Sequence, residues 1–319
     1  MRTMWCAPLL AAGLFVLTGC EDMGDWGPSD RYREDFHYSY ALKPGGTVSL
    51  ESFNGSIEVT SWEEPTVEVN GTKYASQKEY LDEMKVDASA TPGQVRIRMV
   101  RPSFTHGNSG ARFSIRVPKQ VVLDEIVSSN GPIRVDGIEG NVRVRTSNGS
   151  VRIENMKGEL TARTSNGSIE LHDIDGNVRL HTSNGHIDAE ASNGSFEAET
   201  SNAKIEARLV NPVSNWPVRL NSSNGHIDLT LQGPKMPDVR AQTTNSSIEL
   251  HLPPSVNARV RASTSSHSSV TSDFDRLMRS GDDDDRRRDR HSEIEGTLGS
   301  GGPLMDLSTS NGPIKILKN

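Results

Sequence analysis

Apolar and polar residues alternate along most of the chain, in short runs separated by glycine, asparagine and serine. Successive side chains of a strand point to opposite faces, so a run such as Ile169-Glu170-Leu171 predicts a strand with one buried face. The same alternation recurs in short segments between residues 36 and 118. Only residues 76–85 differ, because Tyr80, Leu81 and Met84 follow a helical spacing and predict one short helix.

The second half of the chain repeats one motif at a fixed interval. Ser-Asn-Gly, with Ser-Asn-Ala at Asn202 and Thr-Asn-Ser at Asn245, returns with an apolar-polar-apolar triplet after it. Its first copies have an 18-residue period, and a second strand-like run lies halfway between them. The interval becomes wider after Asn202, and a degenerate copy at His267 precedes the last one. The asparagines of the motif are Asn130, Asn148, Asn166, Asn184, Asn202, Asn224, Asn245 and Asn311.

A fixed repeat of this length predicts coils that stack on one another. We expect an all-β fold, a single-stranded parallel β-helix with 18–22-residue coils and a right-handed path. Each asparagine would lie above its counterpart, and amide hydrogen bonds would join them into a ladder along the axis. The glycine after each asparagine would supply the backbone freedom of a tight turn. An antiparallel stack of hairpins joined by Asn-Gly turns is the alternative fold.

The N-terminal segment, from Met1 to Cys20, predicts export and lipid attachment. Arg2 gives a basic start, residues 7–16 are apolar, and the stretch ends Leu17-Thr18-Gly19-Cys20, which resembles a bacterial lipobox. Cleavage before Cys20 would remove the other cysteine, Cys6, and leave a chain with one lipidated cysteine and no disulfide. Two or more acyl chains on Cys20 would suffice for stable membrane anchoring.

The patterns divide the chain into four parts. Residues 1–19 are the signal segment, and residues 20–35 are the lipidated cysteine with an acidic tether. Residues 36–118 are an N-terminal β region that caps the solenoid. Residues 119–319 are the repeats, interrupted by a charged loop at about 273–296 that contains the Asp and Arg run of residues 281–290.

Composition narrows the possible partners. Hydrophobic residues make up 33% of the chain and aromatic residues 5%, which suits a thin, repetitive β structure better than a large aromatic core. The formal net charge is −7, and the sequence has no basic arm or groove. A nucleic-acid partner is therefore not expected.

Several segments resemble the bacterial "putative adhesin" family, a domain of unknown function built of β-strand repeats and common in envelope proteins. The resemblance covers about residues 36–319. It is carried by the segment Asn54-Gly55-Ser56-Ile57-Glu58-Val59, the following Trp62-Glu63-Glu64-Pro65-Thr66-Val67, the short helix near Tyr80, the strand end Ile115-Arg116-Val117-Pro118 and the Ser-Asn-Gly repeats. It implies a β-helix at the cell envelope with adhesion or envelope-stress roles, and it brings no catalytic residues. The charged run at 281–290 departs from the family pattern.

No constellation in the sequence predicts catalysis, a cofactor or a metal site. The repeats lack the aspartates of the calcium-binding β-roll. Four histidines, His172, His181, His186 and His226, are interpreted as exposed polar residues. The charged residues of the strands are interpreted as solvated, alternating surface charge.

The sequence thus favours a lipid-anchored envelope solenoid with a binding, adhesion or structural role. Its partners would be the membrane, through the acyl chains, and an envelope glycan or protein. In a Gram-negative cell it would lie at the outer membrane or the periplasmic face. The alternative is a lyase or hydrolase acting on polysaccharide, which would need carboxylates grouped with Arg or Lys in a groove.

Overall fold

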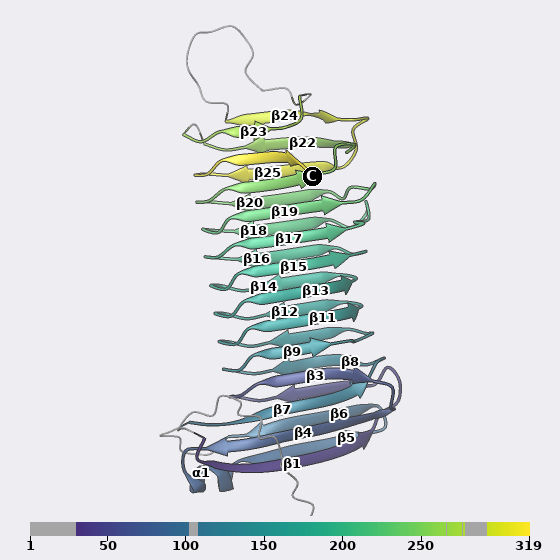
Figure 1. The fold of residues 1–319 in the computed structure, drawn as a ribbon, viewed down its shortest axis with the longest axis vertical. Coiled ribbons are helices and arrows are strands. Elements are labelled where there is room, and N and C mark those ends of the chain that lie inside the picture. Colours follow the sequence, from purple (N-terminus) through teal and green to yellow (C-terminus); the bar gives the residue numbers. More distant parts are fainter. Residues whose placement is uncertain (1–29, 102–107, 266, 276, 278–291) are drawn as a thin grey trace, which may run out of the picture.

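The computed structural model describes residues 30–101, 108–265, 267–275, 277 and 292–319. Cys20, the signal segment and the charged run 281–290 lie outside these residues. The described chain forms a tall rod of two facing sheets, with one short helix, α1 (Lys78–Glu83), at its N-terminal end (Figure 1). This helix confirms the one predicted within residues 76–85.

Each sheet contains 13 strands. The first sheet contains, in spatial order, β1 (Tyr32–Ala41), β4 (Thr66–Ala75), β7 (Ser109–Pro118), β3 (Ile57–Trp62), β9 (Ile133–Asp136), β11 (Val151–Lys157), β13 (Ile169–Asp175), β15 (Ile187–Ser192), β17 (Ile205–Val210), β19 (Ile227–Gln232), β21 (Ile248–Leu252), β26 (Ile314–Lys318) and β23 (Val270–Ser272). The second contains β24 (Glu293–Leu298), β22 (Ala258–Ser263), β25 (Leu304–Thr309), β20 (Val239–Thr243), β18 (Val218–Ser222), β16 (Phe196–Thr200), β14 (Val178–His181), β12 (Leu160–Arg163), β10 (Val142–Arg145), β8 (Val122–Val127), β2 (Thr47–Glu51), β6 (Gln94–Val100) and β5 (Lys85–Thr91).

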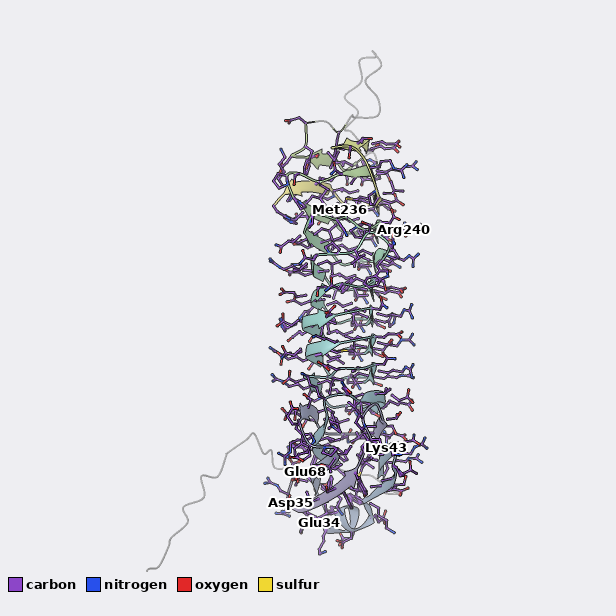
Figure 2. All side chains as sticks on the ribbon, turned by 90° about the vertical axis from the view of Figure 1, so that its right-hand side faces the viewer. Glu34, Asp35, Lys43, Glu68, Met236 and Arg240 are labelled. Atoms are coloured by element: carbon purple, nitrogen blue, oxygen red, sulfur yellow. The ribbon has the colours of Figure 1, made fainter. Side chains whose placement is uncertain are left out.

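The 18-residue repeat sets the register between successive coils. Val151 on β11 lies beside Ile169 on β13, and Leu160 on β12 lies beside Val178 on β14, in parallel pairs. The parallel β-helix is thereby confirmed, and the hairpin stack is excluded. Inward residues such as Ile169 and Leu171 are fully buried, and one continuous apolar core fills the space between the sheets. Side chains of the other set project outward in rows (Figure 2).

The coils at both ends are not stacked in the order of the sequence. The last coil of the chain, β25–β26, pairs on one side with β20–β21 and on the other with β22–β23. The order of the copies in the stack therefore differs from their order in the sequence, because the coil that contains His267 lies beyond the Asn311 copy. At the N-terminal end the first coil, β2–β3, is likewise enclosed between β6–β7 and β8–β9.

Antiparallel strands explain this arrangement. β24 pairs antiparallel with β22 at one end, while β4 and β1 extend from β7, and β5 pairs with β6, at the other. These strands cover edges that would otherwise expose unpaired backbone groups. Two expected boundaries shift as a result. The same two sheets continue through residue 118, and β1 begins at Tyr32, inside the expected tether.

A buried hydroxyl fixes each Ser-Asn-Gly turn to the coil before it. Thr182 is fully buried, and its hydroxyl donates to the Gly167 carbonyl at 3.1 Å and accepts from the Gly185 N–H at 3.2 Å. Other coils carry the same buried position, occupied by Thr146, Thr164, Thr200, Ser222, Thr243 and Thr309. One hydroxyl thus satisfies a donor and an acceptor that water does not reach.

Replacing Thr182 by valine is expected to lower the free energy of unfolding by about 2 kcal/mol, because it leaves two buried backbone groups without a partner. The shift of the urea unfolding midpoint measures this loss. Thr182→Ser is the matched control, since Ser222 accepts from the Gly225 N–H at the equivalent position. The serine variant should lose only about 1 kcal/mol, for the missing methyl group. Equal losses in both variants would contradict a role for the hydroxyl.

Candidate binding groove at the Trp216 loop

One segment projects from the otherwise compact turns of the central coils. Residues 211–217, here called the Trp216 loop, join β17 to β18 and account for the wider spacing between Asn202 and Asn224. Asn211 begins the loop with a φ of 52°, and the Trp216 N–H closes a turn by donating to the Val213 carbonyl at 3.0 Å. The indole of Trp216 is left 39% exposed.

Two hollows flank this loop on the second sheet. One, of about 440 Å³, lies against Trp216, Arg179 and Glu197. The other, of about 700 Å³, lies against Arg240, Leu304 and Asp306. Arg219 and Pro217 line both hollows, so the two form one groove divided by the loop.

The charges in the groove are incompletely balanced. Arg179 is paired with Glu197 at 3.0 Å. Arg219 and Arg240 lie side by side in the register of β18 and β20, and neither makes an ion pair within 4.0 Å in the described part of the chain. Two like charges directly opposite on neighbouring strands destabilise a sheet. An anionic ligand would relieve that repulsion.

Apolar surface borders the same arginines. Trp216 and Leu304 are 39% and 38% exposed, and they are two of the four large hydrophobic side chains exposed to this degree in the described residues. Arg240 projects from the side of the rod, clear of the core (Figure 2). The flat indole of Trp216 lies in the same hollow as Arg219, and Arg240 follows on the next strand. A ring that carries a carboxylate or sulfate fits such a combination of an aromatic face and guanidinium groups.

A third hollow, of about 680 Å³, lies on the first sheet near the N-terminal end. Its polar groups satisfy one another: His37 is hydrogen-bonded to Asn70 at 2.8 Å, and Thr72 donates to Asp35 at 2.7 Å. This hollow therefore offers fewer unsatisfied groups to a ligand than the groove at Trp216.

The asparagines singled out in the sequence form one continuous column. Each side-chain amide donates to the side-chain oxygen of its neighbour, at distances of 2.6–2.9 Å. The column begins at Asn54, which accepts from Asn130 at 2.7 Å and was not assigned to the ladder from the sequence. Its Asn54-Gly55 motif was the available signal. The column joins coils, and none of its asparagines lines either hollow of the groove.

The histidines have different surroundings. His181 lies 3.3 Å from Glu199, and His226 is hydrogen-bonded to Ser247 on the next coil. Cys20 lies outside the described residues. Within the described chain, no helix has the length and apolar character needed to span a membrane.

Comparisons with known proteins identify the family. No curated protein matches the chain. A solved structure of a "putative cell adhesion protein" from Clostridium sporogenes is 10% identical over 90% of this chain and 100% of that one, with a TM-score of 0.22. A "putative adhesin" from Bacteroides fragilis is 12% identical over 89% of this chain and 97% of that one, with a TM-score of 0.28. Residues 47–317 match the family model described as Toastrack DUF4097, and because this match covers most of the chain, the protein belongs to the Toastrack DUF4097 family.

Proposed function

We propose that the protein is a lipid-anchored component of the bacterial cell envelope that acts by binding, and that its ligand is an acidic glycan held in the groove at the Trp216 loop. The single observation that carries the ligand assignment is the Arg219–Arg240 pair, two arginines side by side in register and without an ion pair within 4.0 Å in the described residues, with the exposed Trp216 beside Arg219. The lipobox-like end at Cys20 supports the anchor.

The rod suits a repeating ligand. Parallel strands place equivalent side chains about 4.8 Å apart, which is close to the length of one sugar unit in a polysaccharide. Arg179, Arg219 and Arg240 occupy the same strand position on β14, β18 and β20. In the same row Glu197 lies between Arg179 and Arg219, and Asp306 follows Arg240. A polyanionic chain laid along the axis would therefore meet Arg219 and Arg240 in succession, through charge-assisted hydrogen bonds.

Binding is favoured over hydrolysis by the state of the carboxylates in the groove. Glu197 is engaged by Arg179, and Asp238 accepts from the backbone N–H of Leu304 at 2.7 Å. A glycoside hydrolase needs two carboxyl groups free to act on the two sides of one bond. Glu159 and Asp306 also line the groove, but they lie in different hollows, on either side of the Trp216 loop.

The test is calorimetric titration of the full-length chain with an acidic polysaccharide, polygalacturonate, and a neutral one, dextran. We expect binding of the acidic polymer only. Arg219→Gln and Arg240→Gln should each weaken it about tenfold, because a hydrogen bond to a charged group contributes about 1.5 kcal/mol or more. Trp216→Ala should weaken it several-fold through loss of the stacking surface.

Arg163→Gln is the matched control. Arg163 is an exposed arginine on β12 of the same sheet, outside the groove and without an ion pair in the described structure. Its loss removes the same charge but should leave affinity unchanged. Equal weakening in all three arginine variants would mean non-specific attraction and would contradict a groove site. Release of shortened or unsaturated oligosaccharides would favour the enzyme instead.

A further inference from the structure

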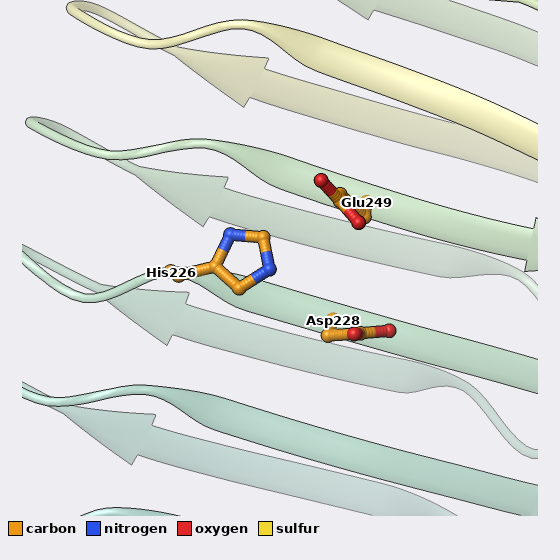
Figure 3. A group of neighbouring side chains, drawn as sticks. All are labelled: His226, Asp228 and Glu249. Carbon is orange, nitrogen blue, oxygen red and sulfur yellow. The ribbon is translucent and has the colours of Figure 1, made fainter.

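A second cluster lies on the opposite, first sheet and is independent of the proposed groove. His226 occupies the turn before β19, Asp228 lies on β19, and Glu249 lies beside Asp228 on the next strand, β21. The three side chains are half-buried, and one potential ligand atom from each lies within 4.8 Å of the others (Figure 3). An imidazole and two carboxylates from adjacent coils thus converge on one point.

The imidazole of His226 is held in a defined orientation. Its Nδ1 lies 2.7 Å from the Ser247 hydroxyl and 3.1 Å from the Ser247 carbonyl. A carbonyl can only accept, so in the tautomer that donates to the Ser247 carbonyl the proton is on Nδ1 and the lone pair is on Nε2. That second nitrogen points toward the two carboxylates (Figure 3). Metal-binding histidines are oriented in this way, by an outer hydrogen bond from one nitrogen while the other coordinates.

Each carboxylate also has an outer partner. Lys315 Nζ lies 2.9 Å from one oxygen of Glu249, and this hydrogen bond holds the pKa of the Glu249 carboxyl below its usual range. His251 Nε2 lies 3.5 Å from one oxygen of Asp228. Each carboxylate retains a second oxygen. The lone pair of Nε2 and two anionic groups therefore face one another across the gap, an arrangement that a cation would stabilise.

We propose that His226, Asp228 and Glu249 bind a divalent transition-metal ion such as Zn²⁺ on the outer face of the first sheet. Three protein ligands of mixed nitrogen and oxygen type, with water in the fourth position, suit Zn²⁺ and not Ca²⁺, which takes six to eight oxygens. Tetrahedral coordination at about 2.1 Å places ligand atoms about 3.4 Å apart. Ligand atoms that now lie within 4.8 Å of one another would have to close by up to about 1.4 Å, a change that small rotations of the carboxylate side chains permit.

The ion would join two coils. Asp228 and Glu249 lie on different strands, and His226 contacts Ser247 across the same interface. A ligand that binds only the folded state stabilises it by mass action. The metal should therefore raise the melting temperature as well as bind.

The neighbouring coils supply a matched control. His186 and Asp188 occupy the same positions two coils earlier, with Glu206 beside Asp188 in register. There the position equivalent to Ser247 is Lys204, whose ammonium is paired with Glu206 at 2.6 Å. The His186 group is accordingly not drawn together as the His226 group is.

The test is calorimetric titration of ZnCl₂ into the full-length chain, purified without a histidine tag, with a thermal melt in parallel. We expect one site with a dissociation constant on the order of micromolar. His226→Gln should weaken it about 100-fold and abolish the rise in melting temperature, whereas His186→Gln should change neither. Lys315→Met should tighten binding on the order of tenfold, because it removes a competing positive charge.

Three outcomes would overturn the site. The first is the absence of Zn²⁺ binding, which would leave the cluster as a contact between an imidazole and two carboxylates. The second is Zn²⁺ binding that His226→Gln does not weaken. The third is binding of Ca²⁺ with the same affinity as Zn²⁺. The metal-free melting temperature of His226→Gln separates a lost site from a lost fold, and it should equal that of the wild type.

Discussion

Gly167→Ala is expected to lower the free energy of unfolding by about 4 kcal/mol. A Cβ at residue 167 would lie 1.8 Å from the Gly149 carbonyl oxygen of the coil below. Because the obstacle is backbone, a side-chain rotation cannot relieve it, and the coils must separate. Overpacking of this kind costs about 3 kcal/mol, and each interstrand hydrogen bond that is lost adds about 1 kcal/mol. The urea unfolding midpoint, with far-ultraviolet circular dichroism as the signal, measures the loss.

Gly93→Ala provides the comparison. Gly93 lies in the turn between β5 and β6, and an added Cβ would meet nothing within 4 Å. That variant should differ from the wild type by less than about 0.5 kcal/mol. A loss of similar size in Gly167→Ala would mean that the coils can move apart at little cost. Close stacking at the glycines would then not stabilise the turn.

The role of the repeated glycine was only partly predicted from the sequence. The Asn-Gly motif predicted that glycine supplies the backbone freedom of a tight turn, yet Gly149, Gly167 and Gly185 do not have positive φ angles. Left-handed backbone occurs instead at another corner, in Asn155 and Asp173. The glycine is required by an approach between coils that appears only when they are stacked.

Local pattern and period were sufficient for the greater part of the fold. The alternation of apolar and polar residues identified the buried face of each strand. The constant 18-residue spacing predicted the register between coils, because in the central repeats coils that are consecutive in the sequence are also stacked on one another. The rule fails at the ends. Asn311 donates to Asn245, 66 residues earlier, because β22, β23 and β24 lie beyond β25 and β26 at the end of the two sheets.

The candidate sites depend on register and were therefore less accessible. The wider spacing near Trp216 indicated an insertion, but the unpaired state of Arg219 and Arg240 follows only from knowing which strands are adjacent. His226 and Glu249 are separated by one coil length, so no short motif joins them. The sequence interpretation of His226 as an exposed polar residue did not include a partner on the next coil, and the structure leaves the residue half-buried.

Cys20→Ala is expected to transfer the protein completely from the membrane fraction to the soluble fraction. An acyl chain contributes about 0.8 kcal/mol per buried CH₂ group; one chain gives marginal attachment and two give a stable anchor. In this proposal the acyl chains on Cys20 supply all of the protein's affinity for the membrane. Membrane fractionation, with mass spectrometry of the mature N-terminus, should show a lipidated cysteine in the wild type and none in the variant.

Cys6→Ala is the matched control, because Cys6 belongs to the segment that cleavage would remove. It should leave both the acylated N-terminus and the membrane fraction unchanged. A wild type recovered in the soluble fraction with an unmodified N-terminus would refute the anchor.

The groove lies on β18 and β20, toward the other end of the rod from β1, where the described chain begins (Figure 1). The released Cys20→Ala protein should therefore bind polygalacturonate with wild-type affinity, which would separate a failure of anchoring from a failure of binding.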